Sequence, residues 1–538
     1  MAKDNSAAIT NVFVVMLENH SFDNVFAMSG IPGIRAATTQ DSNTYTPLSG
    51  LPPTTYHVKD GAPPSMTTDP GHEFPDVLQQ LCGAGPASGY TGGAYPAIDL
   101  SGFASSYATS TSEDTGTPSA EHVGDIMACF HTPAQLPVIN QLAREFAVCD
   151  AWHSSMPGPT WPNRFFVHGA SSAGMTVSPS MGDEIEWETY HGFVYGKGSI
   201  YDRLKEKDHH WRLYQDKDNQ FSDNPSGPEF GGWISQVAAI KGIELWDIHS
   251  LKKFAHDLNA LEHGKPAYHK YRYTFIEPNF GRSFFSPQNG FPGPTYRGGS
   301  SQHPEDDPSG GEGLLKFVYE TLRASPVWDT SLLIVLYDEH GGFYDSVVPP
   351  AAPAPGDPIP KHEVKLNKAK FDFKTYGVRV PAVIVSPLIE KGVVDPTLYD
   401  HASALATLER MLDLGALTCR DAEARDLRHL ITRTTPRDCP RTLAAPLKYP
   451  LPLQPAASLD AAAESPLPKD GNAIGFLQVL LKAELALCGG DPAARAATVT
   501  AFKAITTQSQ ALAYVARMKA KIDAKVAAGH TIALRVVQ

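Results

Sequence analysis

The stretch Asn11-Val-Phe-Val-Val-Met-Leu17 decides the fold, because every side chain after Asn11 in it is apolar. A continuous apolar run of this length is typical of a strand buried on both faces, as in the middle of a parallel sheet. A second run of the same kind, Ser331–Tyr337, lies far downstream. Two such strands, so distant in sequence, predict a large sheet assembled from separate parts of the chain.

Helical patterns alternate with further strand-sized apolar runs. Apolar residues recur at helical spacing in Pro133–Phe146, Glu312–Leu322 and His401–Leu414, and Pro162–Ala170 has the pattern of a helix start. We expect the last of the three full helices to be capped by Asp400 and stopped at Gly415. Additional strands are expected at 146–149, 211–214, 273–276 and 380–385. This alternation predicts an α/β fold, a largely parallel sheet between two helical layers in a three-layer α/β/α sandwich.

The chain of 538 residues is too long for one small domain. We divide it into an α/β catalytic domain at 8–445, a Pro- and Ala-rich linker or surface wrap at 446–469, and an Ala-rich helical region at 470–538. Residues 30–125 are rich in Gly, Pro, Ser and Thr, and we expect a long ordered loop excursion there.

Charge and hydropathy exclude several functions. The chain has 45 basic and 58 acidic residues, a net charge of −13, which argues against nucleic-acid binding. No apolar run reaches the roughly 20 residues that span a bilayer. The first residues lack the basic start of an export leader, so a cytoplasmic protein is the default expectation, with leaderless export left open. Among six scattered cysteines, Cys419 and Cys439 form the one pair suspected of bridging.

Polar groups follow both of the buried strands. Glu18-Asn19-His20 comes directly after the first strand, and Asp338-Glu339-His340 directly after the second. Ligands in open α/β sheets bind beyond the carboxyl ends of the strands, so these groups are expected at one edge. Clustered carboxylates cannot all stay ionised in a buried site without a cation, which predicts a divalent metal. The alternative is that these acids are ordinary helix caps or solvated turns.

A third element, Ser155–Arg164, contains Thr160 close to an expected helix start. Pro162 suits the first turn of a helix, and a hydroxyl at that end faces free backbone N–H groups and the positive end of the helix dipole. Such a position favours a phosphoryl group. The alternative is that Thr160 is only a helix cap. Arg164 either clamps a phosphate or pairs with Asp150.

Several long motifs carry a family resemblance. They are Leu17-Glu-Asn-His-Ser-Phe-Asp23, Pro157-Gly-Pro-Thr-Trp-Pro-Asn-Arg164, His303-Pro304 followed by Gly311-Glu312, Tyr337-Asp-Glu-His-Gly-Gly-Phe-Tyr-Asp345, and Gly377–Pro381 with Ser386-Pro387 and Asp400-His401. In this order they resemble the bacterial phospholipase C and acid phosphatase family, over residues 11 to about 414. That family is similar to the alkaline phosphatase superfamily in fold. Three positions depart from its usual pattern: Asn24, Ala27 and Ser346.

The resemblance implies roles for individual residues. It implies one or two divalent metal ions, with Zn, Ca, Mn and Mg all open, held by Glu18, Asn19, Asp338 and Glu339. It implies Thr160 as the nucleophile that becomes phosphorylated, with His303 and His72 as catalytic histidines. Further groups expected to contact substrate are Asn19, His249, His340 and Arg164.

These inferences together predict a metal-dependent phosphoesterase. The preferred expectation is a phospholipase C that hydrolyses phosphatidylcholine-like diesters through a phosphothreonine intermediate. The alternatives are an acid phosphatase acting on monoesters and an inactive phosphate- or metal-binding domain. A phospholipid substrate leaves peripheral membrane contact open. One or two of five aromatic side chains are candidates for a cage that binds a quaternary ammonium headgroup by cation–π attraction: Trp152, Trp161, Trp211, Trp233 and Tyr273.

Overall fold

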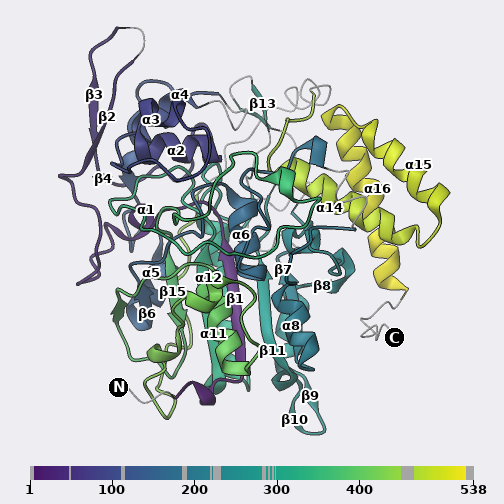
Figure 1. Ribbon diagram of the computed structural model, residues 1–538. Helices are drawn as coiled ribbons and strands as arrows, with labels where there is room; N and C mark the ends of the chain where they lie inside the picture. The colour runs from purple at the N-terminus through teal and green to yellow at the C-terminus, as the bar shows by residue number, and fades with distance from the viewer. Residues whose placement is uncertain are drawn as a thin grey trace.

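The computed structural model describes residues 5–47, 50–110, 116–183, 191–217, 221, 232–281, 286–288, 291–293, 296, 298–449 and 466–528. Its centre is an eight-stranded sheet, which Figure 1 shows running through the lower half of the molecule. The strands lie in the order β16 (Val393–Asp395), β6 (Ala147–Cys149), β15 (Ala382–Val385), β14 (Ser331–Tyr337), β1 (Asn11–Leu17), β11 (Tyr271–Glu277), β7 (His210–Gln215) and β8 (Ile248–Ser250).

The two strands predicted from apolar runs form the centre of this sheet. β1 and β14 pair in parallel over their whole length, from Asn11 opposite Ser331 to Leu17 opposite Tyr337. Every residue of both strands is buried. Because the strands are adjacent, parallel and in register, Glu18 and Asp338 leave the sheet side by side at the same edge.

One strand of the sheet runs against the others. β15 pairs antiparallel with both β14 and β6, whereas the remaining neighbours are parallel. The expectation of a largely parallel sheet is confirmed with this one exception. Since β15 is reversed, the segment before it, including Arg379, approaches the edge at which β1 and β14 end.

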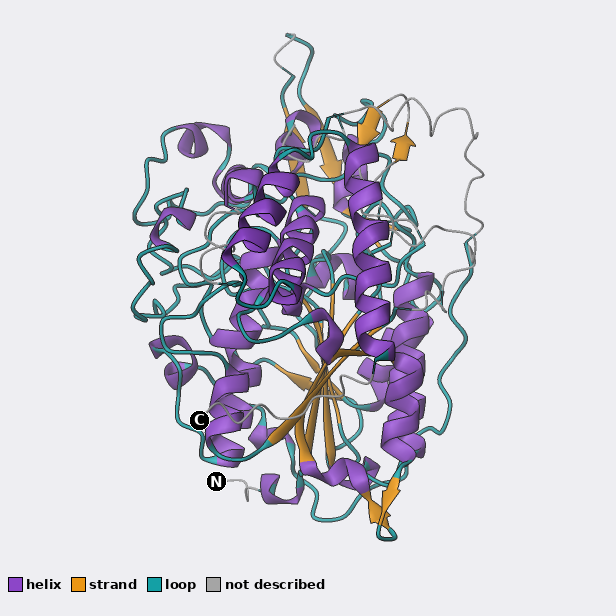
Figure 2. Cartoon of the chain, turned by 90° about the vertical axis from the view of Figure 1, so that its right-hand side faces the viewer, coloured by secondary structure: helices purple, strands orange, loops and turns teal. Residues whose placement is uncertain are grey.

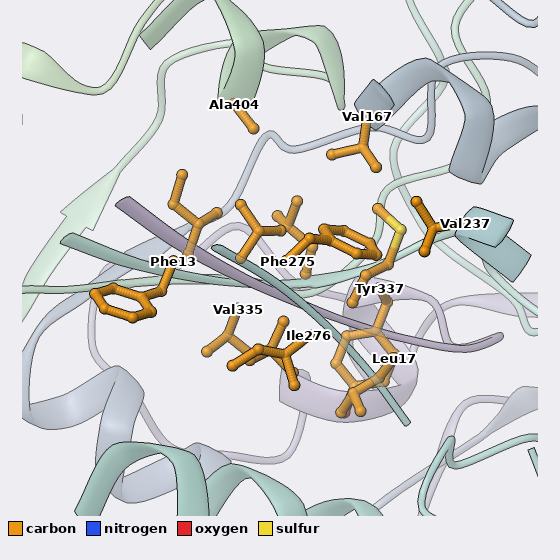
Figure 3. Close-up of a cluster of buried hydrophobic side chains, with 14 of the residues drawn as sticks. Phe13, Leu17, Val167, Val237, Phe275, Ile276, Val335, Tyr337 and Ala404 are labelled. Carbon is orange, nitrogen blue, oxygen red and sulfur yellow. The ribbon is translucent and has the colours of Figure 1, made fainter. Parts of the chain in front are cut away.

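Helices cover both faces of the sheet, as Figure 2 shows with the sheet seen from its edge. One face carries α5 (Pro137–Glu145), α9 (Leu251–Asn259) and α10 (Ser309–Ala324), and the other carries α6 (Thr160–Gly169), α8 (Ile200–Glu206) and α11 (Ala402–Leu412). Neighbouring strands supply both faces: Phe13 packs against Phe254 of α9, and Phe275 against His168 of α6 (Figure 3). The predicted three-layer α/β/α sandwich is confirmed.

The ends of the predicted elements need small corrections. The helix expected from Pro133 begins at Pro137. The helix expected over His401–Leu414 spans Ala402–Leu412, with His401 rather than Asp400 at the N-cap position. It ends before Gly415, because Asp413 already adopts the left-handed conformation that terminates a helix.

Three helices form the carboxy-terminal part of the described chain: α14 (Asn472–Leu487), α15 (Pro492–Lys503) and α16 (Gln508–Ala527). α14 packs against the catalytic body at η4 (Gln236–Ala239) and against both of its own neighbours. Most of the expected linker, residues 450–465, and the last residues, 529–538, lie outside the described residues. The division at 446 and 470 stays a prediction.

Two further expectations concern the whole chain. Over the described ranges no helix is both long and apolar enough to cross a bilayer. The suspected bridge between Cys419 and Cys439 is not formed, since both are free thiols, the first exposed and the second buried.

Candidate active site

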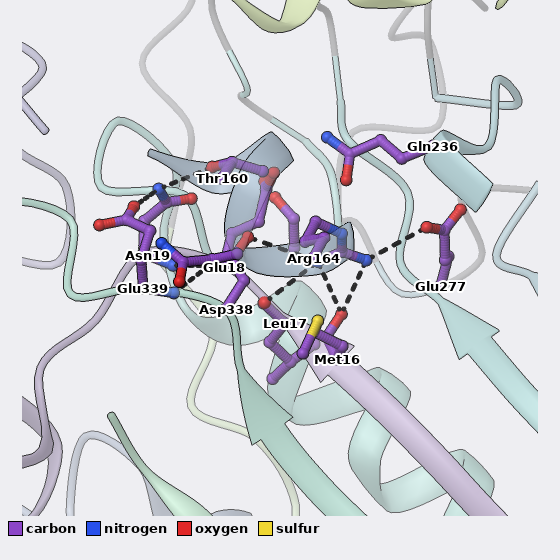
Figure 4. A network of polar contacts seen from close by, with 12 residues as sticks. Met16, Leu17, Glu18, Asn19, Thr160, Arg164, Gln236, Glu277, Asp338 and Glu339 are labelled. Carbon is purple, nitrogen blue, oxygen red and sulfur yellow. Dashed lines mark hydrogen bonds and ion pairs between the residues drawn. The ribbon is translucent and has the colours of Figure 1, made fainter. Parts of the chain in front are cut away.

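The carboxyl ends of β1 and β14 bring four predicted metal ligands together (Figure 4). Glu18 and Asn19 follow β1, Asp338 and Glu339 follow β14, and all four are buried. The backbone N–H of Asn19 donates to Asp338 Oδ1 over 3.1 Å, and its side-chain amide donates to Glu339 Oε1. The parallel register of the two strands is therefore the cause of this cluster.

The backbone at the cluster is tightly fitted. Asn19 has a φ of 61°, a left-handed conformation that asparagine tolerates better than most residues. Gly341 also has a positive φ, and a Cβ there would lie 2.1 Å from the carbonyl oxygen of Asn19. Only glycine allows the two loops to approach this closely, which keeps Asn19 against the end of β14.

Thr160 is the first residue of α6, one position inside the helix from Pro159, the N-cap residue. Its hydroxyl oxygen accepts a hydrogen bond from Asn19 Nδ2 over 3.2 Å. Asn163 fixes the preceding loop, accepting from the N–H of Met156 and donating to the carbonyl of Gly158. The alternative that Thr160 serves only as the cap does not hold, and its hydroxyl faces the carboxylate cluster.

Arg164 lies one helical turn beyond Thr160, beneath the carboxylates. It pairs with Asp338 at 3.5 Å and with Glu277 at 3.3 Å, and it donates to the carbonyls of Met16 and Leu17. The expected pairing with Asp150 is wrong, because Asp150 pairs with Arg35. The guanidinium of Arg164 is fully buried and paired with these groups. It therefore stabilises the buried side of the carboxylate cluster and is not positioned to bind a phosphate.

The electrostatics of the cluster fit a divalent cation. Burial and the neighbouring Asp338 raise the pKa of Glu18 to about 8. Burial raises the pKa of Asp338 to about 7 despite the opposing charge of Arg164. Two buried oxygens, Glu18 Oε2 and Asn19 Oδ1, have no hydrogen-bond partner within the described part of the chain. Unpartnered oxygen ligands and surplus carboxylate charge are what a hard cation such as Ca²⁺, Mg²⁺ or Mn²⁺ compensates.

A second group of side chains, Asp69, His72 and His303, could also hold a metal ion. Their ligand atoms all lie within 4.8 Å of one another, and all three residues are buried. His72 Nδ1 donates to the carbonyl of Pro70 at 2.9 Å, which fixes the orientation of the ring. Asp69 was missed in the sequence, although it stands in the same Asp69-Pro-Gly-His72 motif as the predicted histidine.

His303, the third member of this group, is buried, and its ring stacks on that of Tyr296 with the ring centroids 3.4 Å apart. Its Nδ1 accepts the backbone N–H of Glu305, so the ring proton lies on Nε2, 3.4 Å from Asp69 Oδ2. Burial, with a smaller effect of the His72 charge, holds the pKa of His303 well below its usual value. The low pKa favours the neutral ring, whose proton lies on Nε2 as long as no cation is bound between His303, His72 and Asp69.

Two further histidines support the ligands. His340 contacts Glu339 Oε2 at 3.3 Å through Nδ1 and the side chain of Gln80 at 2.8 Å through Nε2. His401 donates from Nε2 to the backbone carbonyl of Asp338 over 2.6 Å. Both histidines hold a ligand-bearing strand end in place.

His249 is not brought to the site. It lies on β8, the edge strand, opposite Tyr214 of β7, and its Nε2 contacts Arg212 at 3.2 Å. β8 is three strands from β1, roughly 14 Å away at the usual strand spacing. The assignment of His249 to substrate binding is therefore wrong for geometric reasons.

The five aromatic side chains that were candidates for a quaternary ammonium cage do not form one. Three of them are buried in core packing: Trp152, Trp161 and Tyr273. Lys519 lies over the ring of Trp233 at 5.7 Å, and Trp211 packs edge-on against Tyr201. No quaternary ammonium site follows from these residues.

The chain is similar in sequence to known phospholipases C. The chain is 33% identical to non-specific phospholipase C6 of Arabidopsis thaliana over 466 residues, 84% of this chain and 78% of the relative. It is 26% identical to non-hemolytic phospholipase C of Pseudomonas aeruginosa over 364 residues, 59% of this chain and 46% of the relative. A solved structure of an alkaline phosphatase superfamily protein from Vibrio parahaemolyticus is 16% identical in sequence to this chain. The match covers 56% of this chain and 63% of that protein, with a TM-score of 0.26, and no conclusion is drawn from it. The family model for the Phosphoesterase family matches residues 9–415. The chain belongs to the Phosphoesterase family and is a hydrolase of phosphoesters.

Proposed function

We propose that the chain is a metal-dependent phospholipase C that uses Thr160 as its nucleophile. The observation that carries the proposal is the contact of the Thr160 hydroxyl with Asn19, inside a cluster of three buried carboxylates. A hydroxyl at a helix N-terminus beside a cation site suits attack on phosphorus. The relatives named phospholipase C support a diester substrate.

Glu18, Asn19, Asp338 and Glu339 would hold the cation. When bound, a divalent cation supplies positive charge beside the Thr160 oxygen, which favours the ionised hydroxyl. Asp69, His72 and His303 would hold a second ion, and without one His303 would donate to a phosphoryl oxygen of the substrate. Arg164 holds Asp338 from below and keeps the ligand set aligned.

The reaction has two displacements at phosphorus. The Thr160 oxygen, having lost its proton, forms a bond to phosphorus, and the bond from phosphorus to the glycerol oxygen breaks. The leaving diacylglycerol oxygen takes up a proton, and the headgroup phosphate stays on Thr160. Water then attacks phosphorus from the opposite side and gives up a proton, the bond from phosphorus to the Thr160 oxygen breaks, and that oxygen takes up a proton as the phosphorylated headgroup leaves. The N–H groups at the start of α6 stabilise the charge that develops on the phosphoryl oxygens.

In the proposed reaction His303 acts first as a hydrogen-bond donor to the bound substrate and then as an acid. As a neutral ring with its proton on Nε2, it donates a hydrogen bond toward a phosphoryl or leaving oxygen. A phosphoryl anion beside the ring would favour its protonated form and raise its pKa. In that state His303 can pass a proton to the leaving oxygen, as a general acid does.

Diesters are expected to be cleaved better than monoesters. The motivation is the Thr-centred block Pro157–Arg164, which resembles the phospholipase branch of the family, and the net charge of −13, which does not attract a dianionic monoester. The test compares kcat/KM for p-nitrophenylphosphorylcholine, dispersed phosphatidylcholine and p-nitrophenyl phosphate, each with and without chelator. A higher kcat/KM for p-nitrophenyl phosphate would instead favour the acid phosphatase. Hydrolysis of none of them would favour the inactive binding domain.

The metal-free protein is expected to lose stability as the pH rises. Glu18 has an ordinary pKa of 4.5 and a folded-state pKa of about 8, so the folded chain keeps a proton that the unfolded chain has lost. The free energy of unfolding therefore falls between about pH 5 and pH 8, and a bound cation in place of the proton removes that loss. Thermal melting across this range, in chelator and separately in excess Mn²⁺ without chelator, measures it.

The matched control for this pH dependence is Glu18→Gln, which cannot titrate. Other buried acids, among them Glu312, also have raised pKa values, so only the difference between the two proteins reports Glu18. The melting temperature of Glu18→Gln in chelator should fall less steeply with pH. Identical slopes in the two proteins would contradict the prediction.

A further inference from the structure

Asn472, the first residue of α14, brings the carboxy-terminal helices into contact with the candidate site. Its Nδ2 donates to Glu18 Oε1 over 3.4 Å. Its Oδ1 accepts from Trp161 Nε1 at 2.6 Å and from Gln236 Nε2 at 3.1 Å. Asn472 is buried and lies well beyond the residues that match the family.

The two donors fix which way the amide of Asn472 points. Because the N–H groups of Trp161 and Gln236 both need an acceptor, Oδ1 must face them, and Nδ2 must then face Glu18. Trp161 directly follows Thr160 on α6. One amide thus connects a proposed metal ligand to the helical turn that carries the proposed nucleophile.

The position of α14 itself is fixed by close packing and buried polar contacts. A Cβ on Gly475 would lie 2.1 Å from the ring of Trp161, so this helix lies directly on the indole. Farther along the helix, Gln478 donates to the carbonyl of Ser180 at 2.7 Å, and buried Lys482 donates to the carbonyl of Ile243 at 2.6 Å. A helix held at several points can place Asn472 accurately against Glu18.

We propose that Asn472 is a positioning residue for Glu18, so that the carboxy-terminal helical segment completes the active site. The inference rests on the proposed function, in which Glu18 holds a divalent cation. Asn472 donates to one carboxylate oxygen, Oε1, and leaves Oε2, which has no hydrogen-bond partner within the described part of the chain, for the cation. Outer partners of this kind typically change metal affinity or activity by 10–100-fold when they are removed.

The test measures Mn²⁺ binding by calorimetry in the full-length protein and in Asn472→Ala and Asn472→Asp. Asn472→Asp keeps the size of the side chain and the acceptor for Trp161 and Gln236, but it presents an oxygen to Glu18 where the amide donated. Both variants should bind Mn²⁺ about 10–100-fold more weakly, with a matching loss of kcat. Gln478→Ala, farther along the same helix, should stay within about threefold of wild type, because it removes one hydrogen bond of α14 while Asn472 keeps its partners and Gly475 and Lys482 still hold the helix.

The outcomes separate this inference from the proposed function. Mn²⁺ binding by Asn472→Asp that equals or exceeds that of wild type would overturn the positioning role. If Asn472→Ala does not fold, Asn472→Asp, whose side chain has nearly the same volume, decides the question. A wild-type protein that binds no Mn²⁺ and is indifferent to chelator would reject the proposed function itself. Wild-type binding with unchanged Asn472 variants would reject only the inference.

Discussion

Thr160→Ala is expected to lower kcat/KM by at least a thousandfold, a barrier increase of roughly 4 kcal/mol, while the fold survives. In the proposed mechanism this hydroxyl forms the bond to phosphorus, and it lies at the start of α6 in contact with Asn19. Its removal leaves the carboxylates and the helix terminus unchanged. Turnover of p-nitrophenylphosphorylcholine, with thermal melting as the check on folding, measures the effect.

A conservative variant and a direct measurement of the intermediate test the role of Thr160 further. Thr160→Ser keeps a hydroxyl at the same place and should retain activity within about tenfold of wild type. Mass spectrometry of a rapidly quenched reaction should find the headgroup phosphate on the peptide that contains Thr160. A folded Thr160→Ala protein within about tenfold of wild type would show that another group, or water, attacks phosphorus.

Glu18→Gln and Asp338→Asn are each expected to weaken metal binding by at least a hundredfold, about 2.7 kcal/mol. Both substitutions keep the shape of the side chain. Each removes one carboxylate charge from a buried group of oxygen ligands, so the cation is held less tightly. Activity should fall in parallel, because the Thr160 oxygen then lacks a strong positive charge beside it. Metal analysis and calorimetric titration of the purified variants measure the loss.

The two variants should differ in their stability without metal. Glu18 carries a carboxylate that burial disfavours, so Glu18→Gln should melt in chelator at or above the wild-type temperature. Asp338 pairs with buried Arg164, so Asp338→Asn leaves that guanidinium undercompensated and should melt lower. Asp426→Asn, which alters a carboxylate paired with Arg410 near the surface, is the matched control. The prediction on metal binding has its own contrary outcome: if Glu18→Gln and Asp338→Asn both keep full metal occupancy, the metal ligands lie elsewhere.

Much of the fold and part of the site could be predicted from the sequence. The apolar runs Asn11–Leu17 and Ser331–Tyr337 are buried strands because no polar side chain interrupts them after their first residue. Adjacent parallel strands end at the same edge, so the groups that follow them had to meet. Thr160 could be placed near a helix start because of Pro162. In each case a local pattern, together with the geometry of a parallel sheet, was sufficient.

The partners of buried charges and the direction of one strand were decided only by the tertiary structure. Nothing in the sequence near Arg164 indicates Glu277 as its partner, and nothing near His249 indicates an edge strand. Strand β15 runs antiparallel, although its apolar run is the same for either direction. Asn472 and Glu18 are 454 residues apart, and they meet because α14 packs on Trp161. A local pattern records how a segment buries its own side chains, whereas the partner of a polar group depends on which distant segment the packed core brings beside it.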